Sequence, residues 1–112
     1  MKESRPWGTY EILLDDPSCK VKKIIVNPGQ CPSYQYHYKR SEHWVITSGE
    51  AEVCLDDKTF TLKSGESVYI PKEARHTIKN TTDDPLEFIE IQTGTYFGED
   101  DIVRLKDNYG RA

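Results

Sequence analysis

Turn signals divide the chain into short runs of β-forming residues, and this division limits the folds open to it. Signals such as "NPGQ", "LDDK", "KSGE" and "NTTDDP" recur at short intervals along the 112 residues. The runs between them are rich in Val, Ile, Thr, Tyr and Phe: 20–26, 42–47, 50–56, 58–63, 66–71, 75–80 and 86–92. Many short strands with Gly and Pro in their turns predict an all-β sandwich or barrel.

A helical pattern is confined to the end of the chain. In "GEDDIVRLKDNY" (98–109), Ile102 and Leu105 would lie on one face of a helix, so we expect a short C-terminal helix there. The length fits one domain over residues 1–112, in which residues 1–20 form an N-terminal arm.

Charge and cysteine usage restrict the partners and the compartment. The net charge of −4 argues against nucleic acid or an anionic membrane as a partner, although a small phosphorylated ligand needs only one or two local cations. The three cysteines form no CxxC pair, which is typical of reduced thiols. The first residues lack the apolar core of a signal peptide, and no apolar run approaches membrane-spanning length. We expect a soluble, cytoplasmic protein.

Four polar residues stand among these β-formers and have side chains that bind metals. Gln35 and His37 are two positions apart, so on a strand both would project from one face. Glu42 follows on a strand that could pair back against the first, and His76 opens a later strand. If the second hairpin packs across from the first, the four side chains converge.

Such a set would hold one divalent ion. Two imidazoles, a carboxylate and an amide oxygen suit Zn²⁺, Fe²⁺, Mn²⁺, Ni²⁺ or Co²⁺, and we take Zn²⁺ as the first candidate. A structural zinc site more often uses Cys and closes its coordination shell, so an open shell favours chemistry or ligand binding. A lone histidine on a strand is usually a surface or hydrogen-bonded core residue; the joint spacing carries the hypothesis.

That spacing resembles the two motifs of the cupin superfamily, which are small β-barrels (double-stranded β-helix, or jelly roll) that hold a metal in the lumen. The first motif would span residues 29–49 and the second residues 65–80. The superfamily usually has His at position 35 and Gly at position 73, where this chain has Gln35 and Glu73. Phosphomannose isomerases characteristically use Gln, His, Glu and His.

A closer resemblance is to the isomerase domain of type II mannose-6-phosphate isomerases, which in many bacteria follows a guanylyltransferase domain. It is carried by "RPWGTYEIL", "QYHYKRSEHWVITSGEAEV", "SVYIPKEARHTIKN" and the segment 85–111. The resemblance implies a stand-alone cupin domain that interconverts mannose 6-phosphate and fructose 6-phosphate through a cis-enediol, with Gln35, His37, Glu42 and His76 on the metal. That family typically reads "QMHHHR" where this chain reads "QYHYKR".

The residues beside the ligands supply catalytic candidates. Arg40 is expected to orient the substrate or stabilise its charge, because a guanidinium can grip phosphate or enediolate oxygens. The candidates for the general acid or base are Lys39, His43, Tyr36 and a metal-bound water molecule. His43 points away from the metal if its strand is regular.

The phosphate of the substrate would need a cation of its own. The candidates are Lys22, Lys23, Arg75 and Arg104, and at most one of Lys22 and Lys23 faces the lumen, because they alternate on a strand. By analogy with cupins of this size, we expect a homodimer formed through sheet edges.

Two other functions stay open from the sequence. One is a non-catalytic cupin that binds a sugar phosphate or a nucleotide sugar, because two histidines of the family's middle motif are missing. The other is a different metal enzyme on the same barrel, such as an iron dioxygenase.

Overall fold

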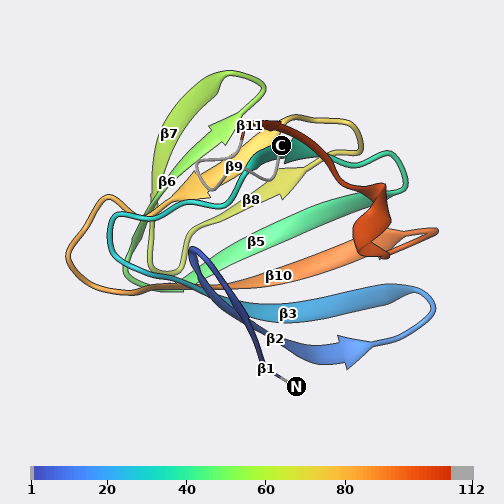
Figure 1. The fold of residues 1–112 in the computed structure, drawn as a ribbon, viewed down its shortest axis with the longest axis horizontal. Coiled ribbons are helices and arrows are strands. Elements are labelled where there is room, and N and C mark those ends of the chain that lie inside the picture. Colours follow the sequence, from blue (N-terminus) through green and yellow to red (C-terminus); the bar gives the residue numbers. More distant parts are fainter. Residues whose placement is uncertain (1, 107–112) are drawn as a thin grey trace.

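The chain folds into two antiparallel sheets that face each other, as Figure 1 shows for residues 2–106, which the computed structural model describes. Within these residues, one sheet has the strand order β1-β2-β3-β10-β5-β8 and the other β11-β4-β9-β6-β7. The strands are β1 Lys2–Arg5, β2 Gly8–Asp15, β3 Cys19–Val26, β4 Tyr34–Tyr36, β5 Arg40–Ser48, β6 Glu50–Leu55, β7 Lys58–Lys63, β8 Ser67–Ile70, β9 His76–Lys79, β10 Leu86–Gly94 and β11 Val103–Lys106. The all-β prediction is confirmed, and the N-terminal arm contains two strands of the larger sheet.

Alternation along the strands decides which side chains are buried between the sheets. On β10, Leu86 and Phe88 are buried; on β5, Trp44 and Ile46 are buried, whereas His43 between Glu42 and Trp44 is exposed. Successive side chains on a strand point to opposite faces, so one face of each strand builds the core. The core cluster consists of Trp7, Tyr10, Ile24, Val26, Trp44, Ile46, Ala51, Val53, Leu62, Ile70, Ala74, Ile78, Leu86 and Phe88.

The hairpin between β6 and β7 has the tight turn that the sequence predicts. Leu55 pairs with Lys58, and the two residues between them, Asp56 and Asp57, have φ of 48° and 68°. Two-residue hairpins need this left-handed backbone, which Asp tolerates better than most residues. The Asp56 carboxylate also accepts a hydrogen bond of 2.9 Å from the backbone N–H of Arg75, which ties this turn to the start of β9.

Each of the two cupin-like motifs is divided between the sheets. In the first motif β4 and β5 lie in different sheets, and in the second β8 and β9 do. Instead, β4 pairs with β9, and β5 pairs with β8. The expectation that the Glu42 strand pairs back against the Gln35 strand is therefore wrong, because both edges of β5 are occupied by β10 and β8.

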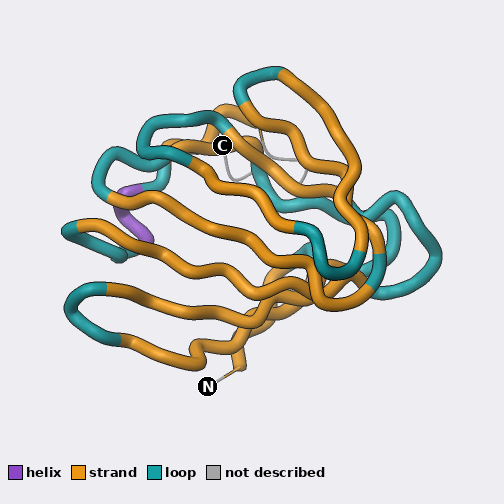
Figure 2. The backbone as a smooth tube through the Cα atoms, turned by 180° about the vertical axis from the view of Figure 1, so that it is seen from behind, coloured by secondary structure: helices purple, strands orange, loops and turns teal. Residues whose placement is uncertain are grey.

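The expected C-terminal helix is also wrong. Only Glu99–Asp101 form a single 3-10 turn, drawn as the purple segment in Figure 2, and β11 follows it at once. The β-branched residues Ile102 and Val103 favour extended backbone, and the edge of β4 offers hydrogen-bond partners, so the segment pairs there, with Val103 opposite Tyr36. Residues 107–109 of the expected helix lie outside the described range.

Three smaller expectations concern the surface and the thiols. Among residues 2–106, no helix has the length and hydropathy of a membrane span. Cys19, Cys31 and Cys54 are half-buried thiols and form no disulfide. Strands β1 and β8 are the edges of the larger sheet, and the homodimer expected through such edges stays a prediction.

Phe88 offers a test of the core. Its ring is buried and lies 5.5 Å from the Trp44 ring, so Phe88→Ala should lower the free energy of unfolding by about 3–5 kcal/mol in a urea titration. Leu13→Ala is the control, because Leu13 is 52% exposed and its loss should change the value by less than about 0.5 kcal/mol. A loss below about 1 kcal/mol for Phe88→Ala would contradict a packed core at this position.

Candidate metal centre

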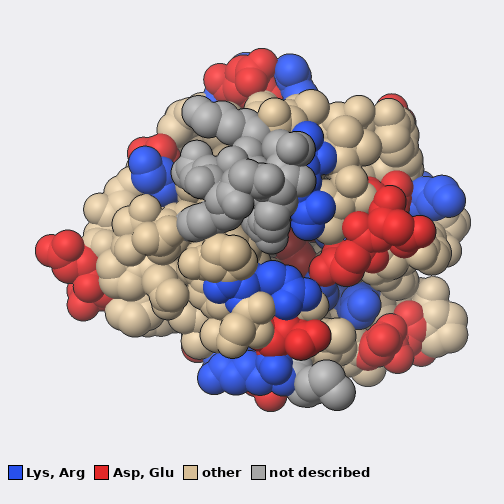
Figure 3. All heavy atoms as spheres, in the orientation of Figure 1, with Lys and Arg blue, Asp and Glu red and all other residues tan. Residues whose placement is uncertain are grey.

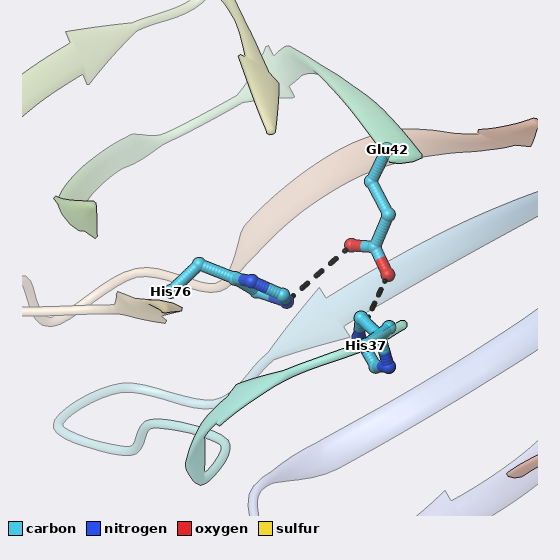
Figure 4. A group of neighbouring side chains, drawn as sticks. All are labelled: His37, Glu42 and His76. Atoms are coloured by element: carbon cyan, nitrogen blue, oxygen red, sulfur yellow. Dashed lines mark ion pairs between the residues drawn. The ribbon is translucent and has the colours of Figure 1, made fainter. Parts of the chain in front are cut away.

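Three of the four predicted ligands converge between the sheets. His37, Glu42 and His76 come from the end of β4, from β5 and from β9, and Figure 4 shows them pointing toward one another. One ligand atom of each lies within 4.8 Å of the other two. Nε2 of His37 is 3.2 Å from Oε2 of Glu42, and Nε2 of His76 is 3.8 Å from Oε1. All three residues are at most 4% exposed, so bulk water does not satisfy these groups.

Backbone carbonyls fix the orientation of both imidazoles. Nδ1 of His37 lies 3.1 Å from the carbonyl oxygen of Asp101, and Nδ1 of His76 lies 2.9 Å from that of Ala74. A carbonyl can only accept, so Nδ1 carries the proton and Nε2 keeps its lone pair toward the cluster. This arrangement is typical of histidines that bind metals.

Two backbone features hold the loops that carry these residues. Glu73 has a φ of 66°, and its N–H donates to the carbonyl of His37 at 2.7 Å. Position 73, where Gly is expected from the resemblance to cupins, therefore has the left-handed backbone that Gly adopts most easily, here with a glutamate. Gly94 has a φ of 147°, and a Cβ on it would lie 2.2 Å from the Lys39 carbonyl oxygen, so only glycine lets β10 approach the start of β5 this closely.

Gln35 is the fourth predicted ligand, and it lies directly beside the cluster. It is the register partner of His76 in the β4–β9 pairing and lines the same pocket. Its Nε2 donates to Oγ of Ser33 at 3.0 Å, which leaves the amide oxygen as the atom available to an ion. The structure thus brings together two imidazole nitrogens, a carboxylate and an amide, a donor set that fits a divalent transition metal.

Arg40 joins this cluster from the first position of β5. Its Nε and Nη2 are each 2.9 Å from Oε2 of Glu42, and Nη2 is 3.1 Å from Nε2 of His37. Its Nη1 is buried in the pocket wall and has no hydrogen-bond partner among the residues that the structure describes. One guanidinium therefore stabilises the Glu42 carboxylate and presents a free donor to whatever enters.

The protonation states of the cluster favour cation binding. Burial alone would raise the pKa of Glu42, but its close contacts with His37, His76 and Arg40 outweigh it and hold the pKa well below its ordinary value. Burial lowers the pKa of His76, against the opposing charge of Glu42. An ionised carboxylate and a neutral imidazole are the forms that bind a metal.

Sequence reasoning missed Glu90, a second buried carboxyl group in this pocket. Trp44 Nε1 donates to both Glu42 and Glu90, at 2.9 and 3.1 Å, and Gln92 Nε2 donates to Glu90 at 2.7 Å. Burial and the neighbouring Glu42 charge raise the pKa of Glu90 to about 8, so it is neutral at pH 7. The alternation of "LEFIEIQ" carried the signal, because it puts Glu90 on the same face as the core residue Phe88.

The other catalytic candidates point away from the pocket. His43 is exposed on the outer face of β5, against Tyr69. Lys39 is exposed, with its Nζ over the Tyr96 ring. The Tyr36 hydroxyl pairs with that of Tyr38 at 3.2 Å on the exposed side. Of the residues named for catalysis, Arg40 alone is among the described residues that line the pocket.

The four phosphate candidates separate in the same way. Lys22 and Arg104 line the pocket. Lys23 projects from the opposite face of β3 and pairs with Glu87 at 3.3 Å. Arg75 pairs with Asp57 at 2.9 Å near the β6–β7 hairpin.

The sequence is similar to a known protein family and to a bacterial alginate biosynthesis protein. The family model "Mannose-6-phosphate isomerase C-terminal" matches residues 1–107. The chain is 50% identical over 108 residues to the alginate biosynthesis protein AlgA of Pseudomonas aeruginosa, covering 96% of this chain and 22% of that protein. The chain therefore spans about a fifth of the length of such relatives.

Solved structures support the same fold. The cupin domain of Schizosaccharomyces pombe Cnp3 superposes with a TM-score of 0.76 at 16% identity, covering 80% of this chain and 66% of that one. A Klebsiella pneumoniae protein with a double-stranded β-helix domain gives 0.79 at 20% identity, covering 91% and 87%. The cupin fold is thereby confirmed.

The ligand assignment predicts the metal content of variants. His37→Ala and His76→Ala should each lower the bound metal by at least tenfold in elemental analysis of the purified protein, because each removes one of two imidazoles. His43→Ala is the matched control and should keep its metal, since that ring lies on the outer face. Full metal content in His37→Ala would contradict the assignment.

The raised pKa of Glu90 predicts how the free energy of unfolding of the metal-free protein depends on pH. Its folded pKa of about 8 lies above the ordinary 4.5, so the folded protein keeps a proton there that the unfolded chain releases. This contribution to stability is full below pH 4.5 and is lost as the pH rises through about 8. Glu90→Gln should therefore gain stability relative to the parent chain as the pH rises through this range, in urea unfolding with a chelator. A stability difference independent of pH would contradict the buried neutral carboxyl group.

Proposed function

The chain belongs to the family of mannose-6-phosphate isomerase C-terminal domains, and from this premise we propose that it is a metal-dependent isomerase of mannose 6-phosphate and fructose 6-phosphate. The observation that carries the proposal is the convergence of His37, Glu42, His76 and Arg40 in one buried cluster, whose last three members line the pocket. The relative AlgA is named for alginate biosynthesis, and this chain matches 22% of its length. The isomerase activity is proposed for that matching part alone.

The ion would be held by His37, Glu42, His76 and the amide oxygen of Gln35, with Zn²⁺ as the first candidate. When bound, a divalent cation supplies Lewis-acid stabilisation of the negative charge that develops on sugar oxygens in aldose–ketose isomerisation. The site lies between the sheets, which keeps bulk water from competing for these groups.

Arg40 would orient the substrate and stabilise its developing charge. Two of its nitrogens are fixed on Glu42, so the guanidinium is positioned before the substrate arrives, and Nη1 stays free to donate. A fixed donor aimed at an oxyanion needs no reorganisation during the reaction. Trp44 Nε1 donates to the other oxygen of Glu42 and to Glu90, which limits the movement of the carboxylate.

The departures from the family's "QMHHHR" pattern do not argue against catalysis. Tyr38 is 53% exposed and Lys39 is exposed, and neither lines the pocket. Replacing two histidines at these positions therefore leaves the inner wall unchanged. This placement favours the isomerase over a non-catalytic sugar-phosphate or nucleotide-sugar module.

The proposal predicts a specific effect of Arg40. Metal-loaded protein should convert mannose 6-phosphate to fructose 6-phosphate, and Arg40→Gln should keep its metal while the turnover number falls by roughly 10²-fold. Arg75→Gln is the matched control and should keep full activity, because that arginine pairs with Asp57 away from the pocket. The measurement is a coupled fructose 6-phosphate assay alongside metal analysis.

Two outcomes would contradict the isomerase. Metal-loaded protein that binds mannose 6-phosphate without forming fructose 6-phosphate would indicate a binding module. Oxygen consumption that depends on Fe²⁺, without isomerisation, would indicate a dioxygenase.

A further inference from the structure

Lys22 is a buried cation, and its one ion pair within the described residues is a loose one. Only 5% of it is exposed, and its nearest carboxylate oxygen, on Glu99, lies 3.6 Å away, beyond hydrogen-bond distance. The ammonium lies 4.4 Å from the centre of the Tyr10 ring, which is a weaker partner than a carboxylate. An ammonium held out of water in this way is costly unless something else pairs with it.

Two further donors in the same pocket make no hydrogen bond within the described part of the chain. They are Nε of Arg104 and Nη1 of Arg40, and both are buried. Arg104 lies opposite Gln35 in the pairing of β11 with β4, so it belongs to the sheet that faces Lys22 on β3. Both walls of the pocket therefore present cationic donors that have only loose ion pairs or no hydrogen bond among residues 2–106.

The charges that line the pocket leave a positive excess. Among residues 2–106, the cations that line it are Arg5, Lys22, Arg40 and Arg104, and the carboxyl groups are Glu42, Glu90 and Glu99. Four cations against three carboxyl groups give an excess even if all three are ionised, and a bound divalent metal would add to it. Figure 3 shows basic and acidic side chains gathered around a hollow on this face.

Glu99 occupies the place where an incoming anion would be attracted. Its two carboxylate oxygens lie 3.6 Å from Lys22 and 3.9 Å from Nη1 of Arg40, too far for strong hydrogen bonds to either. Its side chain is 49% exposed, and it stands in the short turn Glu99–Asp101 rather than in a strand. An ion pair of this kind, half in water and loosely fitted, is weak enough to be replaced.

We propose that Lys22 and Arg104 form the site for the phosphate group of a phosphomonoester, and that Glu99 is the carboxylate that this phosphate displaces. A phosphate dianion offers three acceptor oxygens and pairs with ammonium and guanidinium groups at shorter distances than Glu99 reaches. The inference rests on the proposed function, because it assigns the phosphorylated end of that substrate.

The experiment measures binding of a hexitol 6-phosphate to the metal-loaded protein by calorimetry. This probe has no carbonyl group to isomerise, so its affinity is independent of turnover. The unphosphorylated hexitol should bind at least tenfold more weakly than the hexitol 6-phosphate. Lys22→Gln and Arg104→Gln should each weaken binding of the phosphorylated probe at least tenfold, and Lys22→Arg should restore most of it.

Two variants sharpen the test. Lys23→Gln is the matched control from the same strand and should bind as the parent chain does, because Lys23 faces outward and pairs with Glu87. Glu99→Gln should bind several-fold more tightly, since it removes the competing carboxylate. Unchanged or weaker binding in Glu99→Gln would contradict the displacement.

The site itself would be overturned if Lys22→Gln and Arg104→Gln, folded and with full metal content, bound the probe as the parent chain does. It would also be overturned if inorganic phosphate binding were lost in His37→Ala but unaffected in Lys22→Gln, because the phosphate would then be a ligand of the metal. A protein that binds the probe through Lys22 without isomerising mannose 6-phosphate would contradict the proposed function alone. An active isomerase with normal probe binding in Lys22→Gln would contradict this inference alone.

Discussion

The site depends on a single buried carboxylate. Glu42 is 2% exposed and accepts hydrogen bonds from Arg40 and Trp44 while lying beside His37 and His76. An ionised carboxylate in a protein interior is tolerated only when it is paired and hydrogen-bonded. Arg40, Trp44 and His76 meet this requirement and also line the pocket, so the condition for burying the charge also builds the site.

The fold and the cluster of candidate ligands could largely be predicted because they follow from local patterns. Alternation on β5 placed Glu42 inside and His43 outside, and the motif spacing indicated that His37, Glu42 and His76 lie together. The pairing of strands could not be deduced, because register depends on which edges remain free once the whole sheet has formed. Glu90 was missed although its alternation was visible, since a carboxyl group in a core position is understood only through its partners Trp44 and Gln92.

The end of the chain shows how tertiary pairing overrides local preference. Three consecutive acidic residues, Glu99–Asp101, suit the first turn of a helix, yet the chain makes one turn and then extends. Extension lets β11 pair with the edge of β4. It also places the carbonyl of Asp101 against His37, and it places Arg104 in the pocket wall. A helix would have given up these contacts, and sequence alone does not reveal them.

The crossed pairing of β4 with β9 and of β5 with β8 has a consequence for the order of folding. Neither half of the chain holds a complete set of ligands, and each half supplies strands to both layers. A full set of candidate ligands exists only after the whole sandwich has closed, because no single hairpin supplies all of them. A bound ion would stabilise the assembled barrel, so it would slow unfolding and have little effect on the folding rate.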